Sequence, residues 1–319
     1  MLDLAIVIVN YNVAPLLRRC LQSVCGSEGD FRYRVCVVDN ASPDDSVALV
    51  RDEFPDVLLV ANDENVGYPA ANNQGLRVLN AGGDDGPRYA LLLNPDTELP
   101  SDALATMLAY MDAEPDVGVA GPRLVLPDGS LDLACRRGFD SMAALFYRMA
   151  GLSRLFPRSP RFARYNMTYL DEHELAEVDS VVGAFMLVRG KAIRAAGLMD
   201  DRFWMYGEDL DWAKRIKDCG WKVIYNPAVT VLHVKRASSK QSARAQLEFY
   251  RAMLIFYYKH YRRSTALWLH LAVLLGIAVK GGPALWSDVL AGPRLLQRPG
   301  FGAQIETQTA LSSSRPSGL

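Results

Sequence analysis

Polar side chains crowd the point where one buried segment of the sequence ends. Residues 89–93 read Tyr-Ala-Leu-Leu-Leu, which is typical of a buried strand, and Asn-Pro-Asp-Thr-Glu follows at 94–98. A turn needs one Asp or Asn at most, so the additional acid indicates either a bound cation or plain solvation. The carboxylate of Asp96 can ligate Mg²⁺ or Mn²⁺, which prefer oxygen ligands and bridge readily to phosphates. The alternative is a surface turn that precedes a helix capped by Ser101.

A second acidic pair, Glu208 and Asp209, stands where a helix is predicted to begin, directly after Phe-Trp-Met-Tyr-Gly at 203–207. Negative side chains at the start of a helix are ordinary helix chemistry, and that interpretation stays open. A carboxylate beside an aromatic floor is also what sugar chemistry requires. Trp204 and Tyr206 would support the apolar face of a sugar, and the carboxylate would accept a hydroxyl proton.

His233 is one of four histidines and lies on an apolar segment with Val229 and Val231. A histidine in this setting is commonly a satisfied core residue, but its imidazole is also a frequent metal ligand. The adjacent acids in Gly-Gly-Asp-Asp-Gly at 82–86 have no strand before them, so we interpret that stretch as a solvated loop.

Short buried segments alternate with amphipathic helices along most of the chain. Helices are predicted from about residue 13, with Asn12 as the cap, and over residues 47–54, 70–80, 103–111 and 210–219. The predicted strands are residues 4–9, 35–38, 57–60, 89–93, 117–120, 181–188, 221–225 and 229–234. This order predicts an α/β fold with an open, mostly parallel sheet. Because ligands of such sheets bind at the carboxyl ends of the strands, we expect Tyr11, Asp39, Asn65 and Asp96 to share one rim.

Composition excludes several classes of protein. The chain has 319 residues, 50% of them hydrophobic and 22% charged, which suffices for one large domain with an appendage. A formal net charge of −1 offers no basic surface for nucleic acid. Five cysteines without a Cys-x-x-Cys pair indicate neither a disulfide framework nor a zinc site, and favour a reducing cytoplasmic location. We expect the first residues to form a strand rather than a signal peptide. Asn-Tyr-Asn at 10–12 stands where a dinucleotide-dependent oxidoreductase would have a glycine-rich turn, which argues against that class of enzyme.

The character of the sequence changes after residue 236. We expect a catalytic domain at 1–236, a helical extension at 237–297, and a disordered Gly/Pro/Ser-rich tail at 298–319.

An apolar segment at 266–279 has 14 residues and is interrupted by His270, so it is too short to span a bilayer. Basic residues flank it, among them Lys280. We expect an interfacial helix on the inner face of the cytoplasmic membrane, attracted by anionic lipid. The alternative is a buried helix that packs on the catalytic domain or on a second copy of the chain in a homodimer.

Eight stretches carry a family resemblance in order along residues 4–235. They are IVIVNYN, VVDNAS, ENVGYPAANNQG, LLLNPDTEL, GVAGPRLVLPDGSLD, VVGAFMLVRG, GLMDDRFWMYGEDLDWAKRIKDCGWKVIYNP and VLHV. Together they resemble the family 2 glycosyltransferases of GT-A fold, and more narrowly their bacterial rhamnosyltransferase-like branch.

The resemblance implies roles for individual residues. Asp39 would contact the base or ribose of a nucleotide, with Tyr11 near it, and Asp96 would be the last acid of a metal-binding Asp-x-Asp motif. Asp209, with Glu208 beside it, would be the catalytic base, and His233 would complete the metal site. The predicted nucleotide-sugar-binding residues are Asn10, Tyr11, Asp39, Asn65, Gly67, Asn73, Asn94 and Asp96.

One position departs from the family pattern, because Asn94 replaces the usual first acid of the motif. An amide is a neutral and weaker metal ligand, so a strict requirement for Mg²⁺ or Mn²⁺ is less secure than in relatives with two acids.

The resemblance implies an inverting glycosyltransferase of cell-envelope glycan synthesis. The expected donor is dTDP-L-rhamnose, with UDP- or GDP-linked sugars as alternatives, and the expected acceptor is lipid-linked or a polysaccharide. A non-catalytic protein that only binds nucleotide sugars would have the same fold. Such a protein would show donor binding without transfer.

Overall fold

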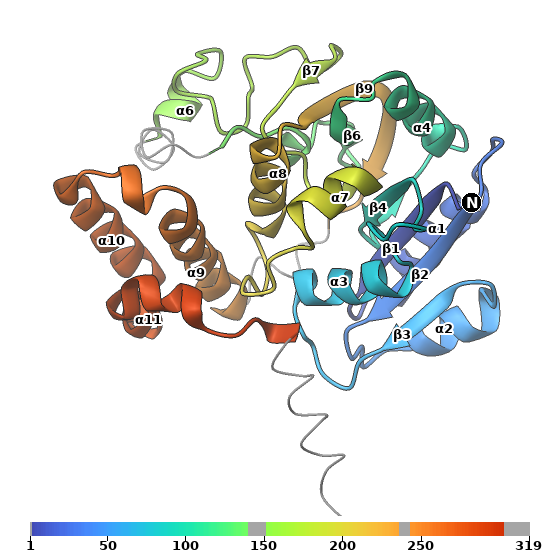
Figure 1. Ribbon diagram of the computed structural model, residues 1–319, viewed down its shortest axis with the longest axis horizontal. Coiled ribbons are helices and arrows are strands. Elements are labelled where there is room, and N and C mark those ends of the chain that lie inside the picture. The colour runs from blue at the N-terminus through green and yellow to red at the C-terminus, as the bar shows by residue number, and fades with distance from the viewer. Residues whose placement is uncertain (1, 140–150, 236–242, 303–319) are drawn as a thin grey trace, which may run out of the picture.

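A computed structural model describes residues 2–139, 151–235 and 243–302 (Figure 1). In these residues one nine-stranded sheet has the order β3-β2-β1-β4-β8-β6-β9-β5, and β7 pairs with β9. The strands are β1 Leu4–Asn10, β2 Tyr33–Asp39, β3 Leu58–Ala61, β4 Tyr89–Leu93, β5 Thr97–Glu98, β6 Val117–Val125, β7 Ala176–Glu177, β8 Phe185–Arg189 and β9 Lys222–His233.

The first half of the sheet follows the predicted α/β pattern. β1 pairs in parallel with β2 and β4, and β2 pairs in parallel with β3. All seven residues of β1 are buried because helices cover both faces, which is why its sequence reads as an unbroken apolar run. β8 runs antiparallel between β4 and β6. The predicted α/β fold with a mostly parallel sheet is confirmed.

Helices connect the strands in the predicted places. They are α1 Ala14–Cys25, α2 Ser46–Glu53, α3 Tyr68–Val78, α4 Ala103–Ala113, α7 Gly190–Ala196 and α8 Glu208–Asp218, with a short α6 at Leu152–Leu155. The buried residues of α1 lie on one face of the helix and are Leu16, Leu17, Cys20, Leu21 and Val24.

The predicted cap of α1 is wrong. Asn12 has a positive φ of 56°, and its backbone N–H donates to the Ser42 hydroxyl at 2.9 Å. Val13 occupies the cap position, without a side-chain hydrogen bond to the helix. Asn12 therefore forms a left-handed turn instead, a conformation that asparagine tolerates better than most residues.

Two strand predictions also need correction. The segments predicted at 221–225 and 229–234 form the single strand β9, whose register against β6 shifts between Pro122 and Arg123. The strand predicted from residue 181 begins only at Phe185. No sequence pattern predicted β5, a two-residue strand that pairs antiparallel with the end of β9.

The C-terminal helices form a second apolar cluster beside the sheet domain, at the left of Figure 1. They are α9 Ala243–His260, α10 Leu267–Gly281 and α11 Trp286–Ala291, with short 3-10 turns between and after them. Phe203 and Leu210, on either side of the start of α8, belong to this cluster and join it to the sheet domain.

Part of the predicted disordered tail is ordered. The backbone N–H of Phe301 donates to the Asp201 carbonyl at 3.0 Å, whereas residues 303–319 lie outside the described residues. Across the described ranges, none of the helices combines the length and the apolar character that crossing a membrane would require.

Candidate active site

A cavity of about 1180 Å³ lies between the carboxyl ends of the strands and the C-terminal helices. Side chains from distant parts of the sequence meet in it. Tyr11 and Asn65 line it after β1 and β3, Asp96 after β4, Asp209 from α8, and His233 from the end of β9. The predicted clustering of strand-end residues is thus seen for Tyr11, Asn65 and Asp96.

Asp96 and His233 face each other, with 3.3 Å between Asp96 Oδ1 and His233 Nε2. The pairing of β5 with β9 causes this proximity, because Thr97 is directly opposite His233 in the register. The backbone N–H of Val234 also donates to the Asp96 carbonyl at 2.8 Å. Two short segments far apart in the chain are therefore fixed to one another at the site.

A third residue, Asp132, holds the other side of the imidazole. Its Oδ2 lies 2.8 Å from His233 Nδ1, and its Oδ1 accepts a hydrogen bond of 2.8 Å from Lys235. Burial opposes ionisation of Asp132, but the bonds from His233 and Lys235 outweigh it and hold its pKa well below the usual range. Burial likewise opposes protonation of His233, while Asp132 and Asp96 raise its pKa to about 9.

The Asp132 contact decides how His233 can act. A carboxylate on Nδ1 fixes the ring orientation and directs Nε2 toward Asp96, as carboxylates commonly do behind metal-bound histidines. Sequence reasoning missed Asp132, because it interpreted the surrounding Asp-Gly stretch only as a turn.

The residues present fit a divalent cation. An oxygen of Asp96 and a nitrogen of His233 converge on the cavity, and both atom types are ligands of Mn²⁺ and related ions. Within the described ranges no cluster of three or more His, Cys, Asp or Glu side chains could hold a metal by itself. The side-chain oxygen of Asn94 is already used, because Asn94 Oδ1 accepts a hydrogen bond of 3.0 Å from the Tyr68 hydroxyl. We therefore do not count Asn94 with Asp96 and His233 as a metal ligand. Two protein ligands suit a cation that completes its coordination with donor phosphate oxygens and water.

The acidic pair at the start of α8 enters the same cavity. Tyr206 and Gly207 both have positive φ, 71° and 77°, and this tight turn starts the helix with Glu208 and Asp209 directed inward. Asp209 Oδ2 accepts from the buried Arg137 guanidinium at 2.5 Å. It also accepts from the Gly183 N–H at 3.2 Å, while Oδ1 accepts from the backbone N–H of Leu210 at 2.8 Å. Sequence reasoning did not identify Arg137, which no motif marks.

Glu208 differs from its neighbour. It is 6% exposed, and its Oε2 has no hydrogen-bond partner among the described residues. Burial, and then the adjacent charge of Asp209, raise the pKa of Glu208 to about 8. A carboxyl group with such a pKa can exchange a proton near neutral pH, and Glu208 is among the residues that line the cavity.

The predicted aromatic platform lines the cavity beside these acids. Trp204 lies under the Arg244 guanidinium, 3.9 Å from its ring centroid, and Tyr206 contacts Phe249 edge to face at 5.9 Å. Gly67 makes this arrangement possible. Its φ is 85°, and a Cβ there would be 2.6 Å from the Trp204 carbonyl oxygen, so only glycine fits.

Four of the predicted nucleotide-sugar-binding residues, Asn10, Asp39, Gly67 and Asn73, are not among the described residues that line the cavity. Asp39 is 1% exposed, and its oxygens accept from Asn10 at 2.8 Å and from Ser42 at 2.8 and 2.6 Å. Asn40, the next residue, lines the cavity instead. Asn10 is fully buried beneath this turn.

Asn73 ties α3 to the segment before α8. Its amide donates to the Met199 carbonyl at 2.8 Å, and its Oδ1 accepts from the Met199 N–H at 3.0 Å. Both ends of the side chain are therefore used in the fold.

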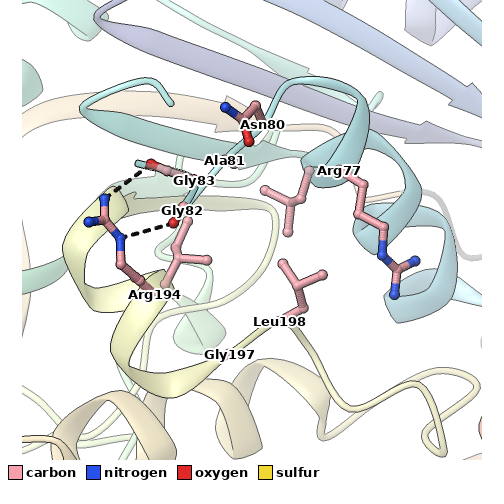
Figure 2. Close-up of a pocket in the computed structure, with 10 residues that line it drawn as sticks. Arg77, Asn80, Ala81, Gly82, Gly83, Arg194, Gly197 and Leu198 are labelled. Atoms are coloured by element: carbon pink, nitrogen blue, oxygen red, sulfur yellow. Dashed lines mark hydrogen bonds between the residues drawn. The ribbon is translucent and has the colours of Figure 1, made fainter. Parts of the chain in front are cut away.

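The loop at 82–86 lies elsewhere. Figure 2 shows Arg194 of α7 directed at this loop, where it bonds to the Gly82 carbonyl at 3.1 Å and to the Gly83 carbonyl at 3.0 Å. It also pairs with the exposed Asp84 at 2.9 Å. The shallow pocket beside the loop has about 400 Å³ and is not lined by either acid, which agrees with a solvated loop.

Comparison with known proteins shows which family this chain belongs to. The family described as glycosyl transferase family 2 matches residues 5–186, more than half of the chain. A relative from Mycobacterium tuberculosis, N-acetylglucosaminyl-diphospho-decaprenol L-rhamnosyltransferase, is 28% identical over 76% of this chain and 80% of its own length.

Two solved structures share the fold. The mannosyltransferase PcManGT from Pyrobaculum calidifontis, solved with GDP-mannose and Mn²⁺, superposes with a TM-score of 0.52 at 19% identity, over 98% of this chain and 81% of that one. GalNAc-T7, solved with UDP, GalNAc and Mn²⁺, has a TM-score of 0.56 at 15% identity, over 99% and 58%.

The sheet, its rim of polar strand ends and these neighbours define a protein of GT-A fold. The chain belongs to glycosyltransferase family 2 and is a glycosyltransferase. Its relatives confirm the resemblance to the rhamnosyltransferase-like branch.

Proposed function

We propose that this glycosyltransferase moves L-rhamnose from dTDP-L-rhamnose to a lipid-linked glycan acceptor, with inversion at the anomeric carbon. The similarity to the mycobacterial L-rhamnosyltransferase, which covers most of both chains, supports this choice of donor and acceptor. UDP- and GDP-linked sugars remain the alternative donors, since the neighbours of like fold were solved with GDP-mannose and UDP.

One observation carries the proposal. The Asp96–His233 pair and the Glu208–Asp209 pair line a single cavity, so a cation-bound diphosphate and an acceptor hydroxyl could be held at the same time. The donor nucleotide would lie toward Tyr11, Asn40 and Asn65, with its diphosphate at Asp96.

The residues would divide the reaction between them. A divalent cation held by Asp96 and His233 would supply positive charge to the departing diphosphate. The acceptor hydroxyl would lie at the acidic pair and lose its proton to Asp209 as its oxygen attacks the anomeric carbon from the face opposite the diphosphate. Arg137 would hold the Asp209 carboxylate in position for this transfer. A single displacement inverts the anomeric centre.

Glu208 is the second candidate for the base. Its unpartnered oxygen and raised pKa suit proton exchange, whereas each oxygen of Asp209 already accepts a hydrogen bond. A carboxylate has about four acceptor positions, so Asp209 can still accept the hydroxyl proton. Turnover of the two amide variants, described in the Discussion, separates the candidates.

The first test measures donor binding through thermal stability. The melting temperature of the full chain is recorded with dTDP-L-rhamnose, UDP-glucose and GDP-mannose, each with and without Mn²⁺. A ligand that binds only the folded state stabilises it by about 2.7 kcal/mol at a hundred times its Kd. We expect a Mn²⁺-dependent increase with dTDP-L-rhamnose alone, and its loss in Asp96→Ala.

An increase with only a UDP- or GDP-sugar would overturn the proposed donor. Binding of dTDP-L-rhamnose without transfer to any lipid-linked acceptor would instead identify a protein that only binds nucleotide sugars.

A further inference from the structure

Helix α10 has two apolar faces. Leu269, Ala272, Val273 and Ile277 line the cavity, whereas the other face turns large apolar side chains to solvent. These exposed residues are Trp268 (72%), Leu271 (58%), Leu275 (66%) and Val279 (70%). A surface helix of a globular domain ordinarily has one apolar face, and a large exposed apolar patch marks a membrane or partner contact. One face of α10 therefore lines the cavity, and the opposite face is an exposed apolar surface.

Helix α9 supplies the facing wall. Ala245, Phe249, Ala252, Met253 and Phe256 line the cavity and recur at helical spacing, so they form one apolar stripe. The acidic pair meets this stripe partway along it, since a Cβ added at Gly207 would lie 3.6 Å from the Ala252 Cβ. The catalytic cavity thus continues, without a break, into an apolar corridor between α9 and α10.

Two cations stand at one end of this corridor. Arg244 is in the first turn of α9 and Lys280 in the last turn of α10, and both line the cavity. The two helices join through a short turn, and Gly281 lies against Tyr250, so the end of α10 packs against the first half of α9. The cavity therefore combines positive charge at Arg244 and Lys280 with the acidic pair beside Ala252 and with hydrocarbon along the rest of the stripe.

This combination of two cations and an apolar corridor suits an anionic diphosphate joined to a long apolar chain. We propose that the corridor between α9 and α10 binds the hydrocarbon chain of a lipid diphosphate acceptor, and that the exposed face of α10 rests on the bilayer that supplies it. The inference rests on the proposed function, because it assigns the acceptor of that reaction to a place in the fold. Arg244 and Lys280 would face the diphosphate, which leaves the sugar of the acceptor at Glu208 and Asp209.

The test measures binding of farnesyl diphosphate to the full chain by titration calorimetry, with no sugar donor present. Ala272→Phe and Val273→Phe each place a ring in the corridor, and we expect binding at least about tenfold weaker than in the wild type. Leu275→Phe makes the same kind of change on the outer face of the same helix, and we expect wild-type affinity. Melting temperatures of all variants show whether they are folded.

Wild-type affinity in both folded corridor variants would overturn the proposal, as would the absence of binding to the wild type. If one corridor variant does not fold, the other decides. Neither result depends on sugar transfer. Farnesyl diphosphate bound in the corridor without any rhamnosyl transfer would refute the proposed function alone, whereas transfer with unaltered binding in the variants would refute the corridor alone.

The outer face is tested by co-sedimentation with vesicles of phosphatidylglycerol and phosphatidylcholine. Leu271→Gln with Leu275→Gln should release most of the chain from the vesicles, while Val273→Phe, on the cavity side of the helix, should sediment as the wild type does. Unchanged sedimentation would overturn the contact of the outer face with the bilayer. A loss of dimer in the same variant would assign that face to a second copy of the chain.

Discussion

Two buried carboxylate centres face the same cavity, and they are neutralised in different ways. At the first centre Asp96 and Asp132 share the imidazole of His233. At the second centre Asp209 has the guanidinium of Arg137, 2.5 Å away. A guanidinium keeps its charge at any accessible pH, whereas an imidazole can release its proton and ligate a metal instead. The partner of each carboxylate therefore suits the first centre to holding a cation and the second to handling a proton.

The largest effect should come from Asp209→Asn, which keeps the shape of the side chain and removes its basicity. We expect kcat to fall about a thousandfold, within the range typical of a lost general base, while donor binding persists. Buried Arg137 would lose its counter-charge, so the melting temperature should also fall. Turnover is measured well below that temperature, with Glu208→Gln alongside.

Full turnover in Asp209→Asn together with loss in Glu208→Gln would transfer the role of base to Glu208. The only role left for Asp209 would then be the ion pair with Arg137. The proposal that this centre handles the proton through Asp209 would be wrong.

A smaller effect is expected from Asp132→Asn, which tests whether the first centre, with Asp96 and His233, holds a cation. Loss of the carboxylate behind a ligating histidine typically weakens metal binding 10- to 100-fold, and we expect about that decrease for Mn²⁺ measured in the presence of dTDP. Asp128→Asn changes an exposed acid of the preceding turn and should leave the affinity unaltered. Equal Mn²⁺ affinity in both variants would show that Asp132 serves only the fold.

The smallest expected effect is on the pH dependence of the melting temperature, and it comes from Glu208→Gln. The pKa of Glu208 is raised from an ordinary 4.5 to about 8 in the folded chain, so the folded state holds this proton more tightly than the unfolded state. The resulting stabilisation is complete below pH 4.5 and is lost as pH rises through about 8. In Glu208→Gln the melting temperature should therefore decrease less between pH 5 and 8 than in the wild type.

Glu114→Gln, at an exposed position, is the matched control and should leave that pH dependence unaltered. A slope in Glu208→Gln equal to that of the wild type would mean that Glu208 does not titrate in this range.

Most of the scaffold could be predicted from the sequence. Continuous apolar runs such as residues 4–9 and 89–93 identify strands buried on both faces, and the helical period of α1 identifies its inner side. The acids of the site could be found as well, because Asp96 follows a strand and Asp209 begins a helix. Each stands in a local pattern that a short window of sequence contains.

The partners of those acids could not be found in this way. Asp132 and Arg137 lie in ordinary turn and loop sequence, and they gain their roles only through contacts 101 and 72 residues away, with His233 and Asp209. The same holds for Asp39, whose strand-end position predicted a ligand contact while its oxygens are used by Asn10 and Ser42.

The sequence by itself determined the order of strands and helices, the polar residues at the rim and the apolar character of α10, because hydrophobic period and turn chemistry are local properties. Only the tertiary structure decided which charge stands beside which. The two-residue pairing of β5 with β9 sets His233 against Asp96, and the buried guanidinium of Arg137 sets Asp209 apart from Glu208. Such contacts depend on the free energy of burying charges together, which no local window of the chain records.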